Sequence, residues 1–122
     1  MSLHEDIQTV SEDLGSACRV RLTGRITIDS SPSLRALLLE RLKSEPCLNL
    51  ILDLSGVSYV DTSGLAIFVE TLKAARTQGK AFHLTGLTER PRYLLEATRL
   101  LRLFDATPAE PPVAKSAQEN SL

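Results

Sequence analysis

Aromatic residues and an excess of positive charge are both missing from this chain. It has no tryptophan, and aromatic residues make up only 4% of the sequence. Fourteen Lys and Arg residues stand against fifteen Asp and Glu residues, which gives a formal net charge of -1. Nucleic-acid binding needs a basic surface and commonly aromatic stacking platforms. We therefore expect no nucleic-acid partner.

Cysteines and long apolar runs are also scarce. Cys18 and Cys47 are the two cysteines, and they lack the paired spacing of a zinc or redox motif. We expect both to be reduced thiols in the core. No stretch approaches the ~20 apolar residues of a membrane-spanning helix, and the N-terminal MSLHEDIQTV does not resemble a signal peptide. These absences predict a cytoplasmic protein with no direct membrane insertion.

The 122 residues provide enough chain for one domain with a substantial core. Hydrophobic residues make up 43% and charged residues 24%, which is typical of soluble globular proteins. Prolines accumulate at 108, 111 and 112. We therefore predict one domain at residues 1–107 and a loosely ordered tail or short terminal helix at residues 108–122.

Strands and helices are predicted to alternate along the chain. Apolar residues with a period of two indicate strands, and those spaced three and four apart indicate helices. The predicted strands cover residues 7–12, 17–23, 48–54, 81–85 and 103–104. The first predicted helix begins with a cap at Ser30 or Ser31, and Pro32 fits its first turn. The other two begin near Leu65 and Thr88, and Pro91 fits the first turn of the last one.

This order predicts an α/β fold. The first two strands form an edge hairpin through a turn at Gly15, and the later strands need parallel crossovers. The result is a mixed sheet of about five strands with helices packed against it. Function in such sheets gathers at the carboxyl ends of the strands, which directs attention to residues 55–64. The scattered arginines Arg90, Arg92, Arg99 and Arg102 are interpreted as a solvated helix face, with a phosphate or acidic-partner patch as the less favoured alternative.

The segment Ser55–Leu65 joins the most hydrophobic strand to the second helix. Asp61, Thr62 and Ser63 are all residue types that cap helices, so capping alone explains their presence. Gly64 is harder to explain, because glycine in a helix costs stability relative to alanine and offers close approach instead. Residue chemistry by itself leaves a plain helix cap and a functional site equally open.

Enzymatic interpretations of the segment fail on spacing. The chain has neither a Gly-x-Ser-x-Gly elbow nor a Gly-rich phosphate loop with lysine. Asp53, Asp61 and Ser58 could gather around a metal or a nucleotide, but two carboxylates without a third ligand make a weak site. We predict no catalytic residue, no metal and no cofactor.

The motifs Leu52–Val57 and Asp61–Leu65, preceded by Leu22–Ile26, resemble the STAS domain of bacterial anti-sigma factor antagonists. The similarity spans about residues 7–105 and implies a STAS-like fold. In that family the first hydroxyl residue after the aspartate is phosphorylated by a partner kinase that is also the anti-sigma factor. The resemblance thus implies phosphorylation at Thr62, with Ser63 as the fallback.

The resemblance further implies an anti-sigma factor antagonist without catalysis of its own. Its unphosphorylated form would bind an anti-sigma factor of the histidine-kinase-like ATPase type, a serine/threonine kinase, and free the sigma factor. Phosphorylation at Thr62 would block that binding. The alternative is a constitutive STAS scaffold or docking subunit, for example in a lipid-transport ABC complex. The implied partner-binding residues are Gly24, Arg25, Ser58, Tyr59, Asp61, Thr62, Ser63 and Gly64.

The chain departs from the family pattern at two places. Threonine occupies the acceptor position, where serine is typical. The sequence Gly24-Arg25-Ile26-Thr27 replaces the frequent Gly-Glu-Leu-Asp, so a cation and a neutral hydroxyl stand where the family often has two acids. The second departure changes the charge that a partner would meet.

Overall fold

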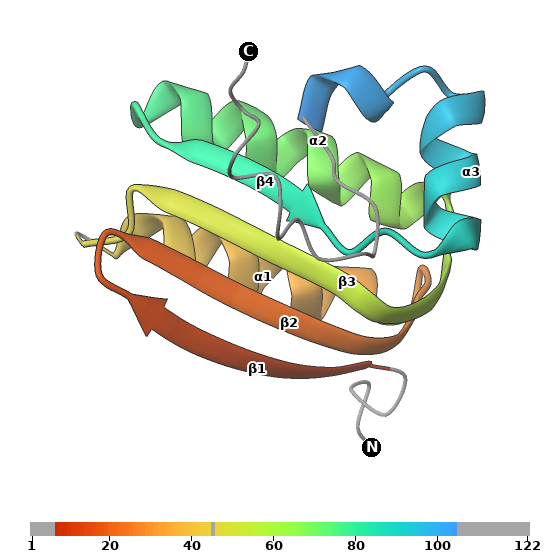
Figure 1. Ribbon diagram of the computed structural model, residues 1–122, viewed down its shortest axis with the longest axis horizontal. Coiled ribbons are helices and arrows are strands. Elements are labelled where there is room, and N and C mark those ends of the chain that lie inside the picture. The colour runs from red at the N-terminus through yellow and green to blue at the C-terminus, as the bar shows by residue number, and fades with distance from the viewer. Residues whose placement is uncertain (1–6, 45, 105–122) are drawn as a thin grey trace, which may run out of the picture.

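The computed structural model describes residues 7–44 and 46–104, which form a mixed four-stranded sheet with helices (Figure 1). The strands lie in the order β1-β2-β3-β4. Their bounds are β1 Ile7–Leu14, β2 Ala17–Ile26, β3 Asn49–Val60 and β4 Ala81–Thr85. The helices are α1 Ser31–Lys43, α2 Thr62–Thr77 and α3 Glu89–Ala97, followed by the 3-10 helix η2 Leu101–Phe104. The predicted α/β class is confirmed.

The N-terminal hairpin and the parallel crossovers are as predicted. β1 pairs antiparallel with β2, and Gly15 in the turn between them adopts a φ of 75°, a conformation that favours glycine. β2 pairs parallel with β3, and β3 pairs parallel with β4. The carboxyl ends of these three strands therefore lie at one end of the sheet, which Figure 1 shows beside α3.

The core lies between the sheet and the helices α1 and α2, which cover one of its faces (Figure 1). Alternate residues of β2 and β3 point into it, including Val20, Leu22, Leu50 and Leu52. Both cysteines are buried and free, as predicted. Ser30 is the N-cap residue of α1, as predicted, but its hydroxyl makes no capping bond. The hydroxyl donates instead to the Arg25 carbonyl at 3.1 Å and thereby holds the β2–α1 turn.

β3 continues to Val60, six residues past its predicted end at residue 54. Register shifts between Arg21 and Thr23 and between Gly24 and Arg25 insert extra β3 residues into the ladder. The buried positions then follow at Leu54, Val57 and Val60, which breaks the alternation that marks a strand in sequence. The polar segment 55–60 therefore belongs to a bulged strand and not to a loop.

The predicted fifth strand at Leu103–Phe104 is wrong, because these residues belong to η2. Phe104 is 1% exposed and packs edge-on against Phe68 of α2 and Phe82 of β4, with centroid distances of 6.4 and 6.1 Å. Two apolar residues in sequence do not distinguish a strand from a helical turn. Here the packing of Phe104 against both α2 and β4 favours the helical turn.

The predicted domain boundary at residue 107 and the tail at 108–122 lie outside the described residues. Within the described part of the chain, no helix has both the length and the apolar character needed to cross a membrane.

Phe104→Ala should lower the free energy of unfolding by ~3–5 kcal/mol, because it removes an aromatic ring that closes the core over α2 and β4. Urea unfolding followed by circular dichroism measures this change. Leu103→Ala is the matched control: Leu103 is 44% exposed, so this substitution should lower the free energy of unfolding by less than about 1 kcal/mol. Equal losses in the two variants would show that η2 does not anchor the core.

Candidate functional site at the start of the second helix

Asp61 is the single residue between the end of β3 and the start of α2. Its backbone N–H donates to the carbonyl of Ile26 at 3.0 Å, so the connection is fastened to the end of the neighbouring strand β2. Its backbone is extended, with φ -103° and ψ -174°, as is usual for a helix N-cap. The carboxyl ends of β2 and β3 and the first turn of α2 thus meet at this residue.

The Asp61 carboxylate is bound by donors from two segments. Oδ1 accepts from the Ser63 N–H at 2.9 Å, the Gly64 N–H at 3.3 Å and the Ser63 hydroxyl at 2.5 Å. Oδ2 accepts from the Ile28 N–H at 3.0 Å, across the β2–α1 turn. Partial burial would raise the pKa of Asp61, but these hydrogen bonds outweigh it and hold the pKa below its ordinary value.

Thr62 and Ser63 differ in accessibility. Thr62 is the first residue of α2 and is exposed, whereas Ser63 is half-buried and donates its hydroxyl to Asp61. Threonine at a helix start carries its hydroxyl beside backbone N–H groups that have no partner within the helix. The Asp61 carboxylate therefore accepts a hydrogen bond from the Ser63 hydroxyl, whereas the Thr62 side chain is exposed to solvent.

Gly64 is buried because α2 approaches the sheet closely at its first turn. A Cβ placed there would lie 2.8 Å from Ile26 Cγ2 and 2.8 Å from Val60 Cγ1. The close approach expected from the sequence is confirmed, and its cause is packing of the helix against the last core residues of β2 and β3.

The structure also brings together the candidate residues of β2 and β3. Arg25 and Tyr59 are cross-strand partners, and the Arg25 guanidinium carbon lies 5.0 Å from the centroid of the Tyr59 ring. Gly24 precedes this pair with a φ of 120° next to a register shift, a conformation that a residue with a side chain rarely adopts. Ser58 is exposed beside them.

Sequence reasoning missed Arg90 as a member of this site. Arg90 lies in the first turn of α3, and its guanidinium carbon is 5.2 Å from the Tyr59 centroid. α3 reaches this end because the Thr88 hydroxyl donates to the Val57 carbonyl at 2.6 Å. The available signal was the position of Arg90 after β4, since helices that follow parallel strands begin at the carboxyl end of the sheet.

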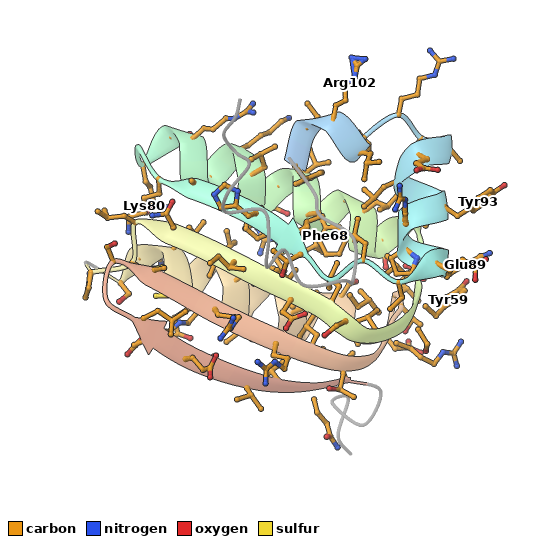
Figure 2. All side chains as sticks on the ribbon, in the orientation of Figure 1. Tyr59, Phe68, Lys80, Glu89, Tyr93 and Arg102 are labelled. Carbon is orange, nitrogen blue, oxygen red and sulfur yellow. The ribbon has the colours of Figure 1, made fainter. Side chains whose placement is uncertain are left out.

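An open groove of about 660 Å³ adjoins Tyr59, between β3 and α3. Figure 2 shows Tyr59, Glu89 and Tyr93 at this end of the molecule, and the Tyr93 side chain is 61% exposed. The lining residues are Ser55, Gly56, Val57, Ser58, Thr88, Glu89, Arg90 and Tyr93.

Asp53 and Asp61 do not form a shared carboxylate site. Asp53 accepts from Arg21 Nε at 3.2 Å and from the Ser55 N–H at 2.9 Å. Burial would raise the pKa of Asp53, but the bonds from Ser55 and Arg21 lower it. Across residues 7–44 and 46–104, no group of three or more His, Cys, Asp or Glu side chains could hold a metal ion.

The family model of the STAS domain matches residues 8–119. The chain belongs to the STAS domain family. Two relatives named anti-sigma-B factor antagonist place it among the anti-sigma factor antagonists. The one from Bacillus subtilis (strain 168) is 34% identical over 107 residues, which are 88% of this chain and 84% of that protein. The one from Staphylococcus epidermidis is 30% identical over 99 residues, or 81% and 89% of the two chains.

Solved structures confirm the STAS-like fold. An anti-sigma factor antagonist from Mycobacterium paratuberculosis superposes with a TM-score of 0.78 at 23% identity, covering 93% of this chain and 95% of that chain. The unphosphorylated form of the anti-sigma factor antagonist SpoIIAA superposes with a TM-score of 0.74 at 14% identity, covering 94% and 99%.

Asp61→Asn should lower the stability of this STAS domain by ~1–2 kcal/mol at neutral pH, because the amide cannot accept all the hydrogen bonds that the carboxylate accepts. The folded-state pKa of Asp61 lies below its unfolded value, so its contribution is present above the unfolded pKa and is lost as the pH falls through the folded one. The difference between wild type and variant in urea unfolding should therefore shrink as the pH falls below about 4. A constant difference down to pH ~2 would contradict this.

Proposed function

We propose that the unmodified chain binds an anti-sigma factor of the histidine-kinase-like ATPase type and so frees the sigma factor in the cytoplasm. The partner then transfers the γ-phosphoryl group of ATP to Thr62, releasing ADP, and the modified chain no longer binds. The observation that carries this proposal is the exposed threonine at the first position of α2. The names of the relatives that are 30–34% identical support the kind of partner.

The acceptor is Thr62 and not Ser63. A phosphoryl transfer needs a hydroxyl oxygen that a kinase can reach in line with ATP. Thr62 is exposed, whereas the Ser63 hydroxyl donates to Asp61 at 2.5 Å and is half-buried. Freeing Ser63 would break a short hydrogen bond to a carboxylate. The hydroxyl geometry therefore favours the residue that directly follows Asp61.

Phosphorylation acts on the interface and leaves the fold in place. A phosphate at the start of α2 meets the positive end of the helix dipole, worth ~0.3–1 kcal/mol, while the Asp61 carboxylate repels it. These opposed effects are too small to unfold the helix. A partner surface that fits a neutral hydroxyl must instead desolvate a group of charge about -2, which costs several kcal/mol.

Catalysis belongs to the partner in this scheme. The chain supplies the acceptor hydroxyl, and its carboxylates Asp53 and Asp61 are held by separate sets of donors. The unmodified chain is then both the ligand of the anti-sigma factor and the substrate of its kinase activity, and the phosphorylated chain is neither.

Thr62→Glu should weaken binding to the anti-sigma partner by at least ~100-fold, because it places a fixed negative charge where the hydroxyl docks. Surface plasmon resonance against each histidine-kinase-like ATPase domain of the source organism measures this. Thr77→Glu is the matched control: the same substitution at an exposed threonine at the far end of α2 should leave affinity within about threefold. Equal affinity of Thr62→Glu and wild type would refute the switch and favour a constitutive docking subunit.

Incubation with the same domains and ATP should add one phosphate to the wild type and to Ser63→Ala, but none to Thr62→Ala. Intact-mass spectrometry distinguishes these products. Thr62→Ser should be modified at least as fast as the wild type, since it keeps the hydroxyl and removes a methyl group. Modification that persists in Thr62→Ala and disappears in Ser63→Ala would move the acceptor to Ser63.

A further inference from the structure

Two arginines from different elements share one tyrosine ring at the carboxyl end of the sheet. Arg25 is the penultimate residue of β2 and Arg90 is the second residue of α3, and their guanidinium carbons lie 5.0 and 5.2 Å from the Tyr59 centroid. Both distances are within the ~6 Å at which a cation is attracted to an aromatic ring. We call Arg25, Tyr59 and Arg90 the arginine clamp.

Neither arginine of the clamp is neutralised by a carboxylate of the described residues. The ion pairs there engage Arg19, Arg21, Arg35, Arg41 and Arg92. Arg25 and Arg90 are both exposed, so their guanidinium donors face solvent. The nearby Asp61 carboxylate is occupied by backbone and hydroxyl donors. Glu89 alone adds an exposed carboxylate to the groove beside the clamp.

The backbone holds the clamp in place. The register shift after Gly24 sets Arg25 opposite Tyr59, and the Thr88 hydroxyl ties the start of α3 to Val57 of β3. Tyr59 is half-buried and so gives both guanidinium groups a fixed surface. Ordering two long side chains before binding reduces the entropy that a partner must overcome. The arrangement is therefore suited to receive a negative group.

We infer that the arginine clamp binds a carboxylate of the anti-sigma partner, presented on an acidic loop that lies along the groove between β3 and α3. This rests on the proposed function, because the clamp lies at the same end of the sheet as Thr62 and would extend that interface. The groove is open to solvent, which suits a protein loop better than a small anion that needs enclosure. Guanidinium groups bind carboxylates through paired hydrogen bonds.

The double variant Arg25→Gln/Arg90→Gln should bind the anti-sigma partner ~10–100-fold more weakly than wild type, with a slower association rate. It should also lose most of the salt dependence of binding between about 0.05 and 0.3 M NaCl. Arg76→Gln/Arg102→Gln is the matched control, because it also removes two exposed arginine charges, one from the last turn of α2 and one from η2, which Figure 2 shows away from Tyr59. It should bind like the wild type. Circular dichroism checks that all three proteins are folded.

A charge exchange identifies the partner group. Arg25→Glu should bind the partner poorly. Replacing one acidic residue of the partner loop by Lys should then raise the affinity for Arg25→Glu at least ~10-fold.

If the double variant binds like the wild type while Thr62→Glu does not bind, the clamp is refuted and the proposed function stands. If the wild type itself binds none of the ATPase domains, both fail. If inorganic phosphate binds to wild type but not to the double variant, and partner affinity is equal in the two, the clamp is a small-anion site.

Discussion

The carboxylate of Asp61 is the interaction on which the geometry of the site depends. It joins the β2–α1 turn, through the N–H of Ile28, to the first turn of α2, through Ser63 and Gly64. The same group removes the Ser63 hydroxyl from solvent and leaves Thr62 exposed. One half-buried carboxylate thus sets both the start of the helix and the difference between the Thr62 and Ser63 hydroxyls. Gly64 completes the arrangement by letting α2 approach Ile26 and Val60.

Local chemistry made much of the fold predictable. The hairpin at Gly15, the parallel crossovers and the buried faces of β2 and the first part of β3 follow from periodicity and turn residues. The extension of β3 over residues 55–60 could not be predicted, because the two register shifts depend on pairing with β2 and are invisible in β3 alone. The same holds for η2, where Phe104 is placed by Phe68 and Phe82, both distant in sequence.

The candidate site also contains residues that could be predicted from the sequence and residues that could not. Asp61 and Gly64 were identified from helix-capping chemistry and the cost of glycine in a helix, and the contacts of both residues agree with those reasons. Arg90 was assigned to a solvated face, because a single sequence does not show that α3 docks on Val57 through Thr88. Ser30 was correctly placed at the N-cap position of α1, but its residue type did not show that its hydroxyl would bond within the preceding turn and not to the helix.

The charges at this end of the sheet connect the switch with partner recognition. Arg25 and Arg90 would give the proposed interface two positive groups that form no ion pair with other described residues, and such groups raise association rates through long-range attraction. A phosphate on Thr62 would add a charge of about -2 at the same end. It would therefore act twice, because it resists desolvation in the interface and also cancels the positive field that draws an acidic partner. A modification with little effect on the fold would in this way switch binding strongly, with Arg25 standing where the family often has an acidic residue.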